Sequence, residues 1–196
     1  MNNNIKPIDI FQTPIWHLNI LNEKYNDDLK NIILQKSEQI PSVRKTNNGG
    51  WQSDDIKNEK IFKPLFVKIG EVMQNLQFKV KDVLMAQAWC NVNFRNNWNV
   101  IHNHGQYNFS AVYFVQKPKE SGELFFRDPR AGLTAFWGDW ADQIYKMYGQ
   151  NAILSRNFMK GDLIIFPGYL DHFVEPSQSD EPRISIAADL NLIYHE

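Results

Sequence analysis

The stretch GDLIIFPGYLDHFVEP, residues 161–176, shows the pattern that decides the fold. Two short runs rich in β-branched and aromatic residues, 162–166 and 171–175, stand on either side of Pro167 and Gly168, which favour a turn. Such runs predict short antiparallel strands. The second run carries His172.

Runs of the same kind occur on both sides of this stretch. The further candidate strands are separated by Gly, Pro, Asn and Asp residues and cover 83–93, 108–116, 122–126 and 183–193. Many short strands with few helices predict a mainly β fold, of the sandwich or barrel type.

The chain before residue 81 has a helical pattern. Asn22 is a suitable N-cap for a first helix, whose apolar positions recur at spacings of three and four: Tyr25, Leu29, Ile32 and Ile33. A second helix is predicted over 61–76, where Pro64 falls in the first turn.

We expect the whole chain, 1–196, to form a single domain, because no repeat, low-complexity linker or charge block divides it. The helical part, 1–80, should pack on one face of a β core, 81–196. Residues 131–156 are rich in aromatic residues and interrupt the strand rhythm, which predicts an insertion. Its rings either pack on the sheet, which we favour, or form a lid or an interface.

Composition excludes several classes of protein. The 21 Lys and Arg residues nearly balance the 22 Asp and Glu residues, which disfavours bulk binding of nucleic acid. Cys90 is the only cysteine and cannot form an internal disulfide, so a reducing compartment is expected. No apolar run is long enough for a membrane span. We therefore predict a cytoplasmic protein.

Three of the five histidines suggest a metal site. His102 and His104 are two residues apart, so on an extended segment both imidazoles point to the same side. His172 lies at the start of a distant candidate strand and could meet them. Imidazole suits Fe, Zn, Cu and Ni alike. The alternative is that these are surface or hydrogen-bonding histidines.

Arg183 and Ser185 share one face of the last candidate strand. A guanidinium among Ile184, Ile186 and Ala187 is costly unless it meets an anion, and its planar fork suits a carboxylate. The alternative is an ion pair with Asp189 or Glu181 at a strand end.

Taken in order, these pieces resemble the Fe(II)/2-oxoglutarate-dependent dioxygenase superfamily, and within it a small group of oxygenases found in phages and marine bacteria. The resembling stretch runs from about Trp89 to Leu192 and includes His102-Asn103-His104, Gly161 to Pro167, Asp171-His172 and Arg183-Ile184-Ser185. The resemblance implies a double-stranded β-helix (a jelly roll, cupin-like), with the N-terminal helices on one face. It further implies that His102 and His172 are iron ligands, and that Arg183, helped by Ser185, binds the distal carboxylate of 2-oxoglutarate.

One position departs from the superfamily pattern, which has His-x-Asp or His-x-Glu before the distal histidine. The carboxylate position here is His104. Either three imidazoles hold the iron, or a carboxylate from elsewhere completes the set, with three candidates: Asp171, Glu123 and Asp128. We favour His104, because Asp171 should point to the opposite side of its strand, and Glu123 and Asp128 would have to reach across. Three imidazoles are chemically acceptable, since Fe(II) then keeps its charge of +2 and still attracts a dianionic co-substrate.

Two further residues are predicted to contact the co-substrate. Tyr113 is favoured over Phe114 as the inward-facing residue of its strand, the alternative being an ordinary core tyrosine. Asn93, two residues after Asn91, could hydrogen-bond 2-oxoglutarate or a metal-bound water, although strand-end asparagines often bond backbone groups instead.

The predicted function is an Fe(II)- and 2-oxoglutarate-dependent oxygenase that uses O2 to hydroxylate an unidentified peptide side chain or small molecule. The alternatives are a cupin-like three-His metalloenzyme that does not use 2-oxoglutarate, and a non-enzymatic jelly roll of a phage structural or accessory complex. A homodimer is left open.

Overall fold

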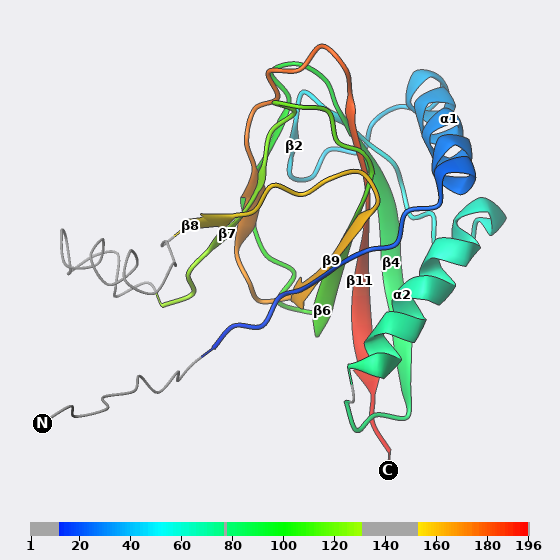
Figure 1. Ribbon diagram of the computed structural model, residues 1–196, viewed down its shortest axis with the longest axis vertical. Helices are drawn as coiled ribbons and strands as arrows, with labels where there is room; N and C mark the ends of the chain where they lie inside the picture. The colour runs from blue at the N-terminus through cyan, green and yellow to red at the C-terminus, as the bar shows by residue number, and fades with distance from the viewer. Residues whose placement is uncertain (1–11, 77, 131–152, 196) are drawn as a thin grey trace, which may run out of the picture.

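Two antiparallel β-sheets face each other in this protein, and two helices cover the outer face of the larger sheet (Figure 1). The computed structural model describes residues 12–76, 78–130 and 153–195. The arrangement confirms the predicted mainly β, double-stranded β-helix fold with N-terminal helices on one face.

Six strands form the larger sheet, in the order β1 (Trp16–Asn19), β9 (Asp162–Pro167), β6 (Phe109–Gln116), β11 (Arg183–Ile193), β4 (Asp82–Asn93) and β3 (Trp51–Gln52). Five strands form the smaller sheet, in the order β2 (Asn47–Asn48), β5 (Trp98–His102), β10 (His172–Val174), β7 (Leu124–Arg127) and β8 (Ile153–Ser155). Neighbours far apart in the sequence therefore pair directly, which is how residues near 90, 110 and 185 come together.

The helices form where the pattern predicts them. α1 (Glu23–Gln39) begins after Asn22, whose side chain accepts a hydrogen bond from the Tyr25 backbone N–H at 3.1 Å. A short 3-10 turn, η1 (Lys60–Phe62), leads into α2 (Lys63–Asn75), which has a proline in its first turn. Leu29 and Ile33 of α1 are fully buried against the sheet.

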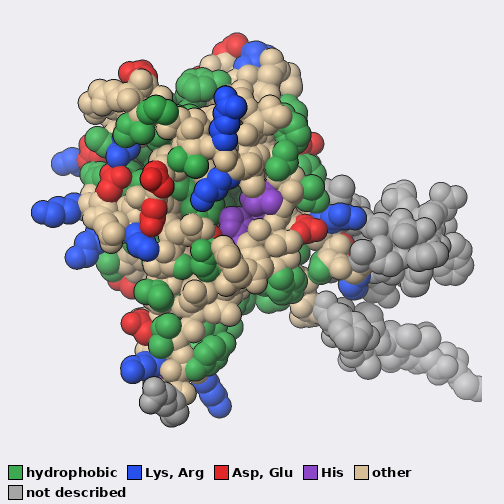
Figure 2. All heavy atoms as spheres, turned by 180° about the vertical axis from the view of Figure 1, so that it is seen from behind, with side chains coloured by type: hydrophobic (Ala, Val, Ile, Leu, Met, Phe, Trp, Pro, Cys, Tyr) green, Lys and Arg blue, Asp and Glu red, His purple; other side chains and the backbone are tan. Residues whose placement is uncertain are grey.

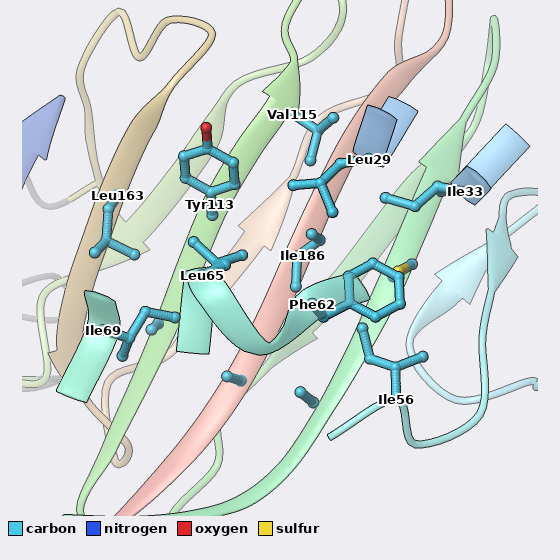
Figure 3. Packing of buried hydrophobic residues seen from close by; sticks show 14 of the residues in the cluster. Leu29, Ile33, Ile56, Phe62, Leu65, Ile69, Tyr113, Val115, Leu163 and Ile186 are labelled. Carbon is cyan, nitrogen blue, oxygen red and sulfur yellow. The ribbon is translucent and has the colours of Figure 1, made fainter. Parts of the chain in front are cut away.

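The larger sheet is buried on both faces, and alternate residues of each strand serve the two faces. In β6, Ala111, Tyr113 and Val115 belong to the core beneath the helices, and Val112 and Phe114 to the core between the sheets. Figure 3 shows the helix-side core, with Leu65 and Ile69 of α2 beside Leu163 and Ile186 of the sheet.

The six predicted strands all form, and five short ones were not predicted: β1, β2, β3, β5 and β8. These strands have only two to five residues, too few for a clear alternation. Most of the predicted insertion at 131–156 lies outside the described residues. Its residues 153–155 form β8, which pairs with β7, so this part belongs to the smaller sheet. No helix among the described residues is long and apolar enough to cross a membrane.

Candidate metal centre

The three predicted histidines meet at one place. His102 ends β5, and the register of the smaller sheet sets it directly opposite His172 of β10. His104 follows two residues after His102, and one potential ligand nitrogen from each of the three residues lies within 4.8 Å of the others. Figure 2 shows the histidines in a hollow of the surface, with Lys and Arg side chains nearby.

His104 lies beyond the end of β5, so a close backbone approach fixes its position instead of strand pairing. Its N–H donates to the Gly168 carbonyl at 2.7 Å. A Cβ atom on Gly168 would collide with the carbonyl oxygens of Tyr107 and His104, so only glycine lets the loop approach so closely. The turn after β9 therefore places two ligands: it leads into His172 and it anchors His104.

Each imidazole uses Nδ1 for a hydrogen bond to an oxygen that can only accept: His102 to the Val100 carbonyl (2.7 Å), His172 to the Leu170 carbonyl (2.9 Å) and His104 to Asp189 Oδ2 (3.1 Å). Nδ1 must therefore carry the proton in all three rings, which leaves the Nε2 lone pairs free. Burial lowers the pKa of His172 to about 3 and also lowers the pKa of His102. Both rings are consequently neutral near pH 7, as metal ligands must be.

The donor set fits a divalent transition metal through three imidazoles. The three carboxylates considered as alternatives are bound elsewhere: Asp171 to the Asn103 side chain (2.8 Å), Glu123 to Lys117 (2.7 Å) and Asp128 to Arg130 (2.6 Å). In the described part of the chain, the cluster of potential ligands contains no carboxylate. The geometry therefore favours His104 over any of them.

Arg183 lies in the same pocket, which is also lined by Ser185, Ala187 and the three histidines. Arg183 is 2% exposed, and its guanidinium lies 5.1 Å from the ring centre of Phe114. Burial lowers its pKa to about 10, against the opposing effect of the Glu123 carboxylate, so the guanidinium stays charged at neutral pH.

The predicted alternative for Arg183, an ion pair with Asp189 or Glu181, does not form among the described residues. Its Nε is buried without a hydrogen-bond partner in that part of the chain. A buried cation with an unused donor, in a pocket that also holds three neutral imidazoles, suits a small anion.

The prediction for Tyr113 is wrong. The hydroxyl of Tyr113 donates to Asn26 Oδ1 of α1 at 2.8 Å, and its ring lies in the helix-side core (Figure 3). Its neighbours Val112 and Phe114 face the space between the sheets instead. Both faces of β6 are buried in largely apolar surroundings. Alternation therefore predicts that residues 113 and 114 face opposite sides of the sheet, but it does not predict which of them faces the helices and which faces the pocket.

Asn93 does not line the pocket itself but contacts a residue that does. Asn91 and Asn99 line the pocket, and the Asn93 Nδ2 donates to Asn99 Oδ1 at 3.0 Å. The prediction that Asn93 contacts the co-substrate directly is therefore wrong. Its side chain instead holds that of Asn99.

Replacing Tyr113 with phenylalanine tests its reassignment. The change leaves the buried Asn26 Oδ1 without its donor, so the free energy of unfolding should fall by about 1–3 kcal/mol. The affinity for 2-oxoglutarate should stay the same. Urea unfolding and co-substrate titration measure the two effects, and a lower affinity at unchanged stability would return Tyr113 to the pocket.

Two residues of the centre were not singled out from the sequence as partners of His104. Asp189 bonds its Nδ1, and the Trp89 ring stacks on it with 5.5 Å between ring centres. Both face the pocket side of their strands, as Arg183 does. Asp189 lies six residues after Arg183 on one strand, so alternation could have predicted that both side chains lie on the same face of the sheet. Alternation does not predict which residues Asp189 contacts.

Comparison with known proteins agrees with this geometry. A family model described as "Putative 2OG-Fe(II) oxygenase" matches residues 87–189, just over half of the chain. The matched stretch contains the three histidines, Arg183 and Ser185. No curated protein matches the sequence.

Several solved structures share the fold. A prolyl-4-hydroxylase from Pseudomonas putida has a TM-score of 0.65 at 11% identity, with 94% of each chain covered. SnoN, a non-heme alpha-ketoglutarate-dependent epimerase from nogalamycin biosynthesis, has a TM-score of 0.71 at 13% identity, covering 91% of this chain and 77% of that one. HygX from Streptomyces hygroscopicus, with nickel and 2-oxoglutarate bound, has a TM-score of 0.64 at 9% identity, covering 91% of this chain and 83% of that one. At these identities the likeness shows the fold alone.

Proposed function

The chain belongs to the 2OG-Fe(II) oxygenase family, and from this premise we propose that it hydroxylates an unactivated C–H bond of a peptide side chain or a small molecule. It is an enzyme that uses Fe(II) and 2-oxoglutarate. In the proposed overall reaction, one oxygen atom of O2 enters the substrate as a hydroxyl group. The other enters 2-oxoglutarate, which leaves as succinate and CO2.

We propose that His102, His104 and His172 hold the iron through Nε2. Their Nδ1–H groups are already engaged, so the three rings are held in one tautomer before metal arrives. When bound, iron supplies the activation of O2. The side chains contribute neutral ligands and a fixed orientation.

Arg183 and Ser185 are proposed to bind the distal carboxylate of 2-oxoglutarate. Both are buried on the pocket face of β11, at 2% and 3% exposure, and the small Ala187 follows them on the same face. A guanidinium offers two parallel N–H groups to a carboxylate, and a serine hydroxyl can add a third donor. The co-substrate would thus lie along the strand, with its keto-acid end toward the histidines.

The single observation that carries the proposal is the convergence of three imidazole nitrogens in a pocket that also holds the buried Arg183, whose Nε has no hydrogen-bond partner among the described residues. Structures of the same fold include a prolyl-4-hydroxylase and an epimerase from nogalamycin biosynthesis, which support a peptide and a small molecule respectively. The single domain, the cytoplasmic location, the absence of bulk nucleic-acid binding and the homodimer stay predictions.

An activity test separates the proposed function from its alternatives. Protein loaded with Fe(II) under anaerobic conditions should develop a visible charge-transfer absorption band when 2-oxoglutarate is added. Admission of O2 should then yield succinate. A three-His enzyme of another chemistry would bind metal and consume O2 without succinate, and a structural jelly roll would bind no stoichiometric metal. Either result contradicts the proposal.

A further inference from the structure

Asp189 is a fully buried carboxylate beside the metal centre, with 0% exposure. Three side chains from distant parts of the chain donate to it: Ser110 to Oδ1 (2.7 Å), Gln87 to Oδ2 (2.7 Å) and His104 Nδ1 to Oδ2 (3.1 Å). The carboxylate is thus held in one orientation, with one oxygen facing His104.

The charge of Asp189 has no permanent cation to balance it within the described residues. Its ion-pair partner there is His104, which is a cation only when protonated. A buried carboxylate without a counter-charge is costly, even when it accepts several hydrogen bonds. A divalent metal on Nε2 of His104 would supply the missing positive charge on the far side of the same ring.

We propose that Asp189 is the anionic positioning partner of the metal site and acts through His104. It fixes the Nδ1–H tautomer and the ring plane, and it makes Nε2 a stronger donor to the metal. The proposed ligand set has no carboxylate, so the negative charge is supplied one hydrogen bond further from the metal. This inference rests on the proposed metal role of His104.

The alternative is a purely structural role, in which Asp189 joins β11 to the Ser110 and Gln87 side chains of β6 and β4. Asp162 offers a matched control, because it too is a buried carboxylate bonded to a histidine. It lies 3.0 Å from His17 Nε2 and accepts from the Asn19 side chain at 2.8 Å, but it belongs to no potential metal cluster within the described parts of the chain. A structural role predicts the same behaviour for both aspartates.

Titration with Cu(II) distinguishes the two roles. In Asp189→Asn the affinity for the metal should fall about tenfold to a hundredfold, and the Cu(II) EPR spectrum should change. Asp162→Asn should lose stability but keep the wild-type affinity and spectrum. Unchanged affinity and spectrum in Asp189→Asn would overturn the inference. A wild-type protein that binds no metal would instead contradict the proposed function.

A double-mutant cycle tests whether the effect passes through His104. In the His104→Ala background, Asp189→Asn should change the remaining Cu(II) affinity less than threefold, because its contact is already gone. The full loss in both backgrounds would contradict the proposal.

A measurement on the unmodified protein covers the case in which Asp189→Asn does not fold. In the Zn(II)-bound protein, nitrogen-15 NMR of the histidine rings should show His104 protonated at Nδ1, with slow exchange of that proton with water. A His104 ring that is protonated at Nε2, or that exchanges freely at Nδ1, would overturn the inference.

Discussion

The His172→Ala protein is expected to bind Fe(II) or Co(II) about 10²–10³-fold less tightly than the wild type, and to form no succinate. Zinc-finger sites with four ligands bind with about 10–16 kcal/mol, so one ligand accounts for about 2.5–4 kcal/mol. His172 is the most buried of the three histidines, at 5% exposure, and stands across the sheet from His102 with 4.3 Å between ring centres. The described residues contain one cluster of three potential metal ligands, and the substitution removes one of its three nitrogens.

Titration of the anaerobic apoprotein measures this effect. His195→Ala is the control, because His195 is exposed near the C-terminus and lies outside the cluster. The His172 ring also packs against Phe166, with 4.8 Å between ring centres, so some stability is lost with it. Unfolding curves must therefore show that the variant is folded at the temperature of the titration. Wild-type affinity in folded His172→Ala protein would remove His172 from the proposed site.

The order of the chemical groups along the chain was enough to predict that these side chains come together. In the structure, one pocket is lined by His102, His104, His172, Arg183 and Ser185. The strands that carry them were also predictable. The apolar run 163–166 marks β9, and in β11 apolar residues alternate with Arg183 and Ser185.

Three features could not be predicted, each for a physical reason. Tyr113 faces the helices because both sides of β6 are buried, so the pattern is the same for either orientation. β2 and β3 have two residues each, and pairing with β5 and β4 creates them rather than any propensity of their own. Asp189 needs partners 79, 85 and 102 residues away, and a register shift follows it in β11. Contacts of this range depend on the finished sheet.

Replacing Arg183 with leucine should lower the affinity for 2-oxoglutarate about 30-fold to 5000-fold while leaving metal affinity unchanged. Loss of one partner of a buried charge pair costs about 2–5 kcal/mol of binding free energy. Leucine keeps apolar bulk beside Phe114 but offers no donor to the distal carboxylate. Lysine keeps the charge and loses the planar fork, so Arg183→Lys should fall between the wild type and Arg183→Leu.

The same substitution should not destabilise the apoprotein, and this sets Arg183 apart from an ordinary core residue. In the described structure its guanidinium is buried without an ion pair and with an unpartnered Nε, so folding without ligand bears the cost of that buried charge. Leucine removes the cost and loses one contact with the Phe114 ring. The free energy of unfolding of apo Arg183→Leu should therefore equal or exceed that of the wild type.

Urea unfolding with and without 2-oxoglutarate measures both effects in one experiment. The wild-type protein should be stabilised by the co-substrate in the presence of a redox-inert metal such as Zn(II), and Arg183→Leu should gain little from it. Arg95→Leu is the matched control, since Arg95 is exposed and paired with Asp180 at 2.7 Å. Its stabilisation by the co-substrate should match the wild type. If Arg183→Leu were instead unstable but still stabilised fully by 2-oxoglutarate, Arg183 would support the fold and the carboxylate would bind elsewhere.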